Sequence, residues 1–273
     1  MNRKFLENFQ NFLQEEMPQE NWQKVDEGIY ENQTRRLAVA LRTQADPIVL
    51  LQDSERYETR NWQLVQLWED VWATQRTLVK SRLKALVGIS QRIPARLTLI
   101  QPLTPAFFQE FLSQNHLQIP VKCAFRYGLF LKEMHQNESF LNDPTIVSGC
   151  VAVAGFGPIR AMPSRGDDYY SGELIRFANV RNHTVVGGLN KLLKAFLGEH
   201  PMQDLMTYAD RDWSTGKSYE RLGFERVSTT PPQELWLDPD TFLRYYPHRV
   251  KGEKPSHWRS IFNTGNYKYI KKL

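Results

Sequence analysis

The stretch of sequence that decides the fold runs from residue 172 to residue 224 and reads GELIRFANVRNHTVVGGLNKLLKAFLGEHPMQDLMTYADRDWSTGKSYERLGF. Its pattern predicts a strand over 172–180, a helix over 185–200, a strand over 204–210 and a short helix over 214–224. Two glycines open the first helix, where they let a ligand approach the backbone and the free N–H groups favour a phosphate. A tight strand-to-helix turn explains the same two glycines equally well.

The elements upstream extend this pattern to a mixed sheet. Residues 95–103 read as a strand, and residues 104–116 read as a helix with Thr104 as N-cap and Pro105 at its first position. Strands over 123–131 and 145–157, joined by the polar turn HQNESFLNDP, favour a hairpin. Two further strands, ERVST and QELWLD, follow residue 224. This order predicts an α/β fold, with a mixed β-sheet flanked by helices.

The rest of the chain is predicted to flank this α/β domain at both ends. Apolar residues at helical spacing predict an amphipathic helix over 2–16 and a longer helix over 61–87. We therefore expect a mainly helical N-terminal region over 1–95, the α/β domain over 96–240 and a C-terminal extension over 241–273. That extension is rich in aromatic residues and carries eight lysines and arginines against one acid.

Composition excludes several classes of protein. The chain has 273 residues, of which 41% are hydrophobic and 24% charged, as is ordinary for a globular protein. No apolar run reaches the ~18 residues of a membrane span, the N-terminus lacks the pattern of a signal peptide, and only two cysteines occur, so we expect a cytoplasmic protein. The six histidines show no metal-binding spacing, and the sequence has no P-loop and no serine-hydrolase motif. No metal is therefore expected.

The segment ending in Tyr219-x-x-x-Gly223-Phe224 resembles the GCN5-related N-acetyltransferase (GNAT) superfamily. The resemblance covers residues 96–238 in the order of their elements. A closer resemblance is to a group of mostly phage-encoded proteins with this fold. Its pattern is matched by the segments Asn115-His116-Leu117-Gln118, Glu173-Leu174-Ile175-Arg176-Phe177, Val185 to Leu192, and Tyr208 to Arg211.

The GNAT resemblance implies an acyl-CoA cosubstrate, normally acetyl-CoA, whose pyrophosphate lies on the loop before the long helix. The residues that it places at the cofactor are Phe177, Ala178, Val185, Val186, Gly187, Gly188, Leu189, Asn190 and Ser214. The loop departs from the family pattern, because Thr184 replaces the usual Gln or Arg and Leu189 replaces the second Gly or Ala. The basic side chains of Arg181 and Lys191 are candidates to compensate in part.

The resemblance also implies catalytic roles. Tyr219 is expected to protonate the departing CoA thiolate, or else to pack its short helix on the sheet. Glu173 and Asp210 are candidates to deprotonate the amine; structural pairing with Arg176 and turn formation are the respective alternatives. His116, Arg176 and Asp212 are the candidate substrate-binding residues, and His183 lies in the phosphate loop.

Two functions follow from these observations. The first is an acyl-CoA-dependent N-acyltransferase, in which an unidentified amine attacks the thioester directly in a ternary complex. The second is a GNAT-like nucleic-acid-binding or DNA-modifying protein, without ordinary acetyltransferase activity, that contacts nucleic acid through residues 241–273. The amine of the first is a small molecule or is linked to nucleic acid, so the two functions are compatible. A C-terminal segment folded back on the domain is the alternative to nucleic-acid contact.

Overall fold

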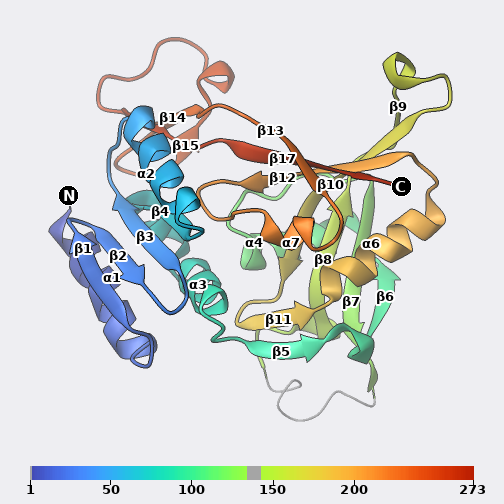
Figure 1. Ribbon diagram of the computed structural model, residues 1–273, viewed down its shortest axis with the longest axis horizontal. Helices are drawn as coiled ribbons and strands as arrows, with labels where there is room; N and C mark the ends of the chain where they lie inside the picture. Colours follow the sequence, from blue (N-terminus) through green and yellow to red (C-terminus); the bar gives the residue numbers. More distant parts are fainter. Residues whose placement is uncertain (1, 134–142) are drawn as a thin grey trace. The chain divides into compact units, whose positions relative to one another are not determined.

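The computed structural model describes residues 2–133 and 143–273 and divides into two compact units (Figure 1). Each unit is built from three stretches of the chain. Unit 1 comprises Met1–Lys80, Ala209–Lys217 and Val227–Lys268, and unit 2 comprises Ser81–Tyr208, Ser218–Arg226 and Tyr269–Leu273. The compact units thus differ from the expected succession of segments 1–95, 96–240 and 241–273.

Unit 1 contains a four-stranded sheet in the order β1-β2-β3-β4. The first three strands are antiparallel, and β4 lies parallel to β3 because helix α2 crosses between them. The elements are β1 (Trp22–Asp26), β2 (Ile29–Asn32), β3 (Leu37–Arg42), α2 (Pro47–Thr59) and β4 (Gln63–Trp68). The N-terminal region therefore contains helices, as expected, together with a β-sheet that was not predicted.

The predicted helix over 61–87 is in fact a strand followed by a helix. Residues 63–68 form β4, and helix α3 (Glu69–Leu86) begins only after it. The apolar residues of QLVQLW fit a helical stripe, but they equally fit a strand buried on both faces, and β4 is buried along nearly its whole length. Its partner β3 lies more than twenty residues upstream, so local spacing could not reveal the pairing.

The predicted helix over 2–16 is confirmed as α1 (Arg3–Glu16), with Asn2 as its N-cap. Its apolar face carries Phe9, which is fully buried and lies 5.6 Å from the ring of Trp72 and 5.3 Å from that of Tyr30. Unit 1 also holds a three-stranded sheet in the order β15-β14-β16. Its strands are β14 (Glu234–Leu237), β15 (Arg244–Tyr245) and β16 (Arg259–Phe262).

The larger sheet has eight strands, in the order β13-β17-β12-β10-β8-β7-β6, with β9 paired to β10. Strands β12, β13 and β17 contribute residues to both units. The elements are β6 (Thr98–Pro102), α4 (Pro105–Asn115), β7 (Phe125–Leu131), β8 (Cys150–Phe156), β9 (Arg160–Ala161), β10 (Tyr170–Asn179), α6 (Gly188–Glu199), β12 (Asp204–Asp210), α7 (Lys217–Glu220), β13 (Glu225–Thr229) and β17 (Asn266–Lys272). Parallel pairing of β10 with β12 beside antiparallel pairing of β10 with β8 confirms the mixed sheet.

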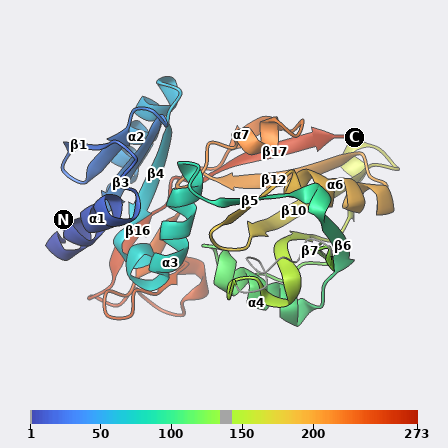
Figure 2. The same cartoon turned by 90° about the horizontal axis from the view of Figure 1, so that it is seen from below.

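Helices α4 and α6 cover opposite faces of the sheet in unit 2 (Figure 2). The ring of Phe196 on α6 stacks on that of Phe156 on β8, with centroids 3.9 Å apart. A Cβ on Gly155, the residue before Phe156 on β8, would point to the opposite face of the sheet and lie 2.3 Å from Phe108 of α4. Side chains alternate along a strand, so adjacent residues of β8 serve the two helices.

Most of the predicted elements of unit 2 are present. β7 and β8 form the expected hairpin, although its turn at 135–144 lies mostly outside the described residues. The predicted helix at 104–116 is α4, with the Thr104 hydroxyl accepting from the N–H of Phe107 at 3.3 Å. No helix in the described part of the chain is long and apolar enough to cross a lipid bilayer.

Candidate functional site

The two parallel strands β10 and β12 separate part-way along unit 2. Their pairing runs from Ser171 opposite Asp204 to Leu174 opposite Thr207 and ends there. β10 continues to Asn179 alongside β8, with a bulge between Leu174 and Arg176. The end of the β10–β12 pairing therefore lies at the carboxyl end of two adjacent parallel strands, where α/β sheets bind ligands.

Two side-chain hydroxyl groups, those of Thr207 and Tyr219, are hydrogen-bonded in series at this point. The Oγ1 of Thr207, a residue 1% exposed, donates a hydrogen bond to the Leu174 carbonyl at 2.9 Å. A second hydrogen bond joins the side chains of Thr207 and Tyr219. The Thr207 proton goes to Leu174, so the phenol of Tyr219 is the donor in this second bond. Tyr219 on α7 is thus positioned at the last rung of the β10–β12 pairing.

Tyr219 is held as a neutral phenol. Burial raises its pKa, while the hydrogen bond with Thr207 and the positive charges of Arg82 and Arg176 offset part of that rise. Its ring contacts those of Phe224 and Tyr269, each at 5.7 Å. The environment keeps the proton on the phenol at neutral pH and places cations where a negative charge would be stabilised.

The Gly-Phe pair of the predicted motif packs against Tyr219. Gly223 adopts φ +81°, a left-handed conformation that other residues rarely adopt, and a Cβ there would come within 2.7 Å of the Lys271 Nζ. The turn that Gly223 allows brings Phe224, which is 3% exposed, back against the ring of Tyr219. The sequence motif therefore has a packing role as well as the catalytic role expected of its tyrosine.

His116 lies in the same electrostatic environment. It caps the C-terminus of α4, and its Nδ1 accepts a hydrogen bond from the N–H of Gln118 at 3.0 Å. Burial and the nearby charges of Arg176 and Arg82 lower its pKa to about 3. His116 is therefore neutral at physiological pH and carries its proton on Nε2.

Glu173 lies one residue before the end of the β10–β12 pairing. Its Cβ and the side chain of Ile175 both lie near Gly157, the residue that follows β8, on the side where a Cβ of that glycine would point. Glu173 and Arg176 both act electrostatically on the thiol of Cys123. No hydrogen bond to the Glu173 carboxylate from a described residue is found. The structure thus brings Glu173, Arg176, His116 and Tyr219 into one connected neighbourhood of unit 2.

The segment between β10 and α6 is more structured than a simple loop. After a short turn, β11 (His183–Val186) pairs in parallel with β5 (Gln91–Pro94), and only then does α6 begin. His183 is buried, and its ring nitrogens lie 2.8 Å from the Arg181 carbonyl and 2.9 Å from the Gln91 side chain. It fixes β11 to β5 and does not project into solvent from a phosphate loop.

The start of α6 offers free donors. Gly187 is the N-cap, with φ +80°, and no side chain caps the helix. The backbone N–H groups of Gly188, Leu189 and Asn190 precede the first intrahelical bond, which runs from Lys191 to Gly187. These N–H groups point along the helix axis while side chains radiate from it, so Leu189 keeps its donor.

The other residues predicted at the cofactor are less suited than the start of α6 to binding a phosphate. Ala178 and Val185 are buried in the fold, while Phe177 is half-buried and Val186 is exposed. Lys191 does not compensate for the missing loop arginine, because its Nζ donates to the carbonyls of Ala95 and Thr98.

Three predicted site residues, Asp210, Asp212 and Ser214, belong to unit 1. Asp212 is 4% exposed, and its Oδ1 accepts from the backbone N–H of Thr264 at 2.9 Å and from its hydroxyl. Burial and the neighbouring Asp210 raise the pKa of Asp212 to about 7. The N–H groups of Asp212 and Ser214 donate to Asp210, as in the turn that was the alternative to a catalytic role.

Sequence reasoning missed Thr207 and Arg82. Thr207 lies inside an otherwise apolar strand, DLMTYAD, and a threonine there is a weak signal because β-branched residues are common in strands. Arg82 lies in the helix that was predicted only as scaffold. Unit 1 also has a cavity of about 280 Å³ that none of the predicted site residues lines; it is lined by Asn2, Thr43, Glu69, Asp70, Leu237, Pro239, Phe242 and Arg259.

Comparison with known proteins gives structural likeness at low identity. No family model matches the sequence, and no curated protein matches it. Among solved structures, Naa50 of Arabidopsis thaliana with a bisubstrate CoA analogue is 11% identical, with a TM-score of 0.39 over 65% of this chain and 99% of that one. The ribosomal-protein-S18-alanine N-acetyltransferase of Escherichia coli is 13% identical, with a TM-score of 0.37 over 64% and 94%.

A Bacillus subtilis acetyltransferase in complex with CoA is 11% identical, with a TM-score of 0.34 over 64% of this chain and 99% of that chain. The chain is thus similar in structure to several GNAT acetyltransferases. The expected relation to phage-encoded proteins finds no support among these structures.

Proposed function

We propose that this chain transfers an acyl group from acyl-CoA to an amine, at the end of the β10–β12 pairing in unit 2. The observation that carries the proposal is the half-buried, neutral phenol of Tyr219 at the last rung of that pairing, Leu174 opposite Thr207. A proton donor at the carboxyl end of parallel strands is suited to chemistry on a bound ligand.

The start of α6 fits the pyrophosphate of CoA. Gly187 in its left-handed conformation leaves the first N–H groups of the helix without a capping side chain, and the helix dipole adds partial positive charge there. Gly187 is exposed, and a Cβ built on it would have only Ala95 as a near neighbour, at 3.7 Å. The donors of Gly188, Leu189 and Asn190 would hold phosphate oxygens through the backbone.

The reaction balances with the residues present. The neutral amine attacks the thioester carbonyl carbon, a C–N bond forms, and the C–S bond breaks. The carboxylate of Glu173 takes the proton from the amine, directly or through a water, and Tyr219 gives its proton to the departing thiolate. The positive charges of Arg82 and Arg176 stabilise the phenolate until it is reprotonated.

His116 and Arg176 are proposed to bind the acyl acceptor. A neutral His116 with its proton on Nε2 can donate one hydrogen bond to the acceptor. Asp210, Asp212 and Ser214 lie in unit 1, where they have the turn and packing contacts described above, so the proposal assigns them no step.

Nucleic-acid contact through residues 241–273 stays a prediction without a favouring observation. These residues form β15, β16 and β17. Arg244 pairs with Asp70, and the Nζ of Lys254 donates to Ser260 at 2.7 Å. Tyr267 and Tyr269 are buried. The segment therefore has the properties of the alternative, a tail that folds as part of the protein.

Titration of the full chain with acetyl-CoA tests the proposal, using the variant Asn190→Asp. A carboxylate near the start of α6 stabilises the helix by about 0.3–1 kcal/mol through the dipole, yet it repels a pyrophosphate. Two like charges about 5 Å apart repel by roughly 1–3 kcal/mol at effective dielectric constants between 80 and 20. We expect acetyl-CoA affinity to fall by roughly 5- to 200-fold, with an unchanged or higher melting temperature.

Asn190→Gln is the matched neutral control and should bind acetyl-CoA as the wild type does. Absence of any calorimetric or thermal-shift response of the wild type to millimolar acetyl-CoA would contradict the proposal. Equal binding by Asn190→Asp and the wild type would exclude the start of α6 as the phosphate site.

A further inference from the structure

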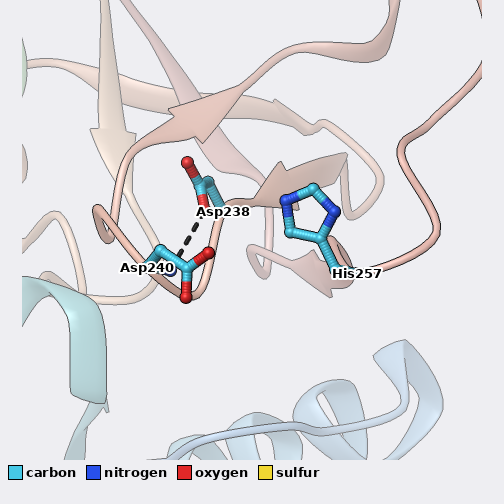
Figure 3. A group of neighbouring side chains, drawn as sticks. All are labelled: Asp238, Asp240 and His257. Carbon is cyan, nitrogen blue, oxygen red and sulfur yellow. Dashed lines mark hydrogen bonds between the residues drawn. The ribbon is translucent and has the colours of Figure 1, made fainter.

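A cluster of three potential metal ligands lies in unit 1, apart from every residue assigned above. Asp238, Asp240 and His257 each offer one ligand atom, and these atoms all lie within 4.8 Å of one another (Figure 3). Asp238 and Asp240 belong to the turn between β14 and β15, and His257 belongs to the loop before β16. Two carboxylates and an imidazole therefore meet from segments separated in sequence.

Strand register brings the two segments together. Leu237, the last residue of β14, pairs with Arg244 of β15 on one side and with Arg259 of β16 on the other. Asp238 follows that rung directly, and His257 precedes it by two residues. The same strand thus anchors both halves of the cluster, so their proximity follows from the sheet itself.

Each half is also fixed locally. In the turn, the N–H of Asp238 donates to the Leu243 carbonyl at 3.0 Å, and the N–H of Phe242 donates to the Asp238 carbonyl at 2.9 Å. In the loop, Trp258 stacks on Tyr245 with ring centroids 4.5 Å apart and an interplanar angle of 16°. That stack orients the backbone that carries His257.

The potential ligands are either fixed in position or open to solvent. The Asp238 carboxylate accepts from the N–H of Asp240 at 3.0 Å and from the Thr241 hydroxyl at 2.8 Å, and these bonds fix its position. Among the described residues, none hydrogen-bonds to the Asp240 carboxylate or to a ring nitrogen of His257. Asp240 and His257 are exposed, so a cation would reach them without rearrangement of the core.

We propose that Asp238, Asp240 and His257 bind a Zn²⁺ ion. One imidazole nitrogen with carboxylate oxygens suits zinc, whereas calcium and magnesium prefer oxygen ligands alone. Two carboxylates neutralise the charge of the ion, and three protein ligands leave a position for water. Bound zinc would cross-link the loop before β16 to the β14–β15 turn. Sequence spacing gave no sign of this site, because two of its ligands are aspartates in a turn.

Competition titration tests the site in the full chain. The protein is stripped of metal with a chelator, and Zn²⁺ is added in the presence of a chromophoric competitor. We expect one equivalent of Zn²⁺ to bind and the melting temperature to rise. His257→Ala should weaken binding by at least about 10–100-fold, the scale on which even outer-shell changes act, and Asp240→Asn should weaken it too.

His248→Ala is the matched control, since His248 is another exposed histidine of unit 1 outside the cluster. It should leave Zn²⁺ affinity unchanged. Loading with Co²⁺ gives a second readout, because visible absorption bands should appear in the wild type and His248→Ala and be absent from His257→Ala. The substituted side chains are exposed, so metal-free variants should unfold at the wild-type temperature, and this is checked first.

Three results would overturn the proposal: no stoichiometric Zn²⁺ binding by the wild type, equal affinity of the wild type and His257→Ala, or displacement of Zn²⁺ by equimolar Ca²⁺. Weaker binding to His248→Ala and to His257→Ala alike would identify scattered surface histidines as the ligands, which also overturns it.

Discussion

Replacing Tyr219 by phenylalanine separates a catalytic from a structural tyrosine. The substitution removes one hydroxyl and leaves the ring, with its contacts to Phe224 and Tyr269, in place. It deletes the hydrogen bond from the phenol to Thr207, which still donates to the Leu174 carbonyl. One such bond contributes about 0.5–1.5 kcal/mol, so the melting temperature should fall by only about 1–6 °C.

The effect on acyl transfer should be far larger. Loss of a positioned general acid lowers the rate by ~10²–10⁴. The assay follows release of CoA thiol from acetyl-CoA with a panel of amines, alongside thermal unfolding and acetyl-CoA titration of the same sample. Affinity for acetyl-CoA should stay close to that of the wild type, because the proposed phosphate donors are backbone groups of α6.

Thr207→Val is the matched control. It removes the Thr207 hydroxyl, so both the Leu174 carbonyl and the Tyr219 phenol lose a buried hydrogen-bond partner. The loss should lower the free energy of unfolding by about 1–3 kcal/mol. The phenol itself remains, so activity per folded molecule should fall less than in Tyr219→Phe. A folded and fully active Tyr219→Phe protein would refute the catalytic role. So would losses of activity in both variants that merely follow their losses of stability.

Three further predictions concern other sites. Glu173→Gln should lower the rate of acyl transfer by ~10²–10⁴. It should change the free energy of unfolding by no more than about 0.5 kcal/mol, because no described residue hydrogen-bonds to the carboxylate. Rate and urea-unfolding measurements check both expectations, and an unchanged rate would exclude Glu173 as the base. The raised pKa of Asp212, about 7, means that its contribution to stability is present below the unfolded value near 4 and is lost as the pH rises to 7. Asp212→Asn should therefore flatten the pH dependence of unfolding between pH 4 and 7, whereas an identical pH profile would contradict the burial argument. Phe196→Ala removes a fully buried ring stacked on Phe156 and should cost about 3–5 kcal/mol in urea unfolding, with a loss below about 1 kcal/mol showing that the helix is not packed as described.

The candidate site was predictable only in part. The patterns YERLGF and GELIRF drew attention to Tyr219, Glu173 and Arg176 as candidates, and the structure brings these residues and His116 into one neighbourhood of unit 2. The sequence did not identify Thr207, since the role of that hydroxyl depends on which strand lies beside β12. It also placed Lys191 near a phosphate, whereas the structure directs this side chain to the carbonyls of Ala95 and Thr98.

What the sequence alone determined is the local structure of segments whose pattern has one physical solution. The alternation in 204–210 gives the strand β12, and the residues Thr104 and Pro105 give the start of α4. Where a pattern has two solutions, tertiary contacts decided between them. Residues 63–68 became a strand because β3 offers a parallel partner, and residues 183–186 became a strand because β5 does. Pairing partners far along the chain leave no mark on local spacing, so only the folded chain shows where β10 and β12 separate and which side chains meet there.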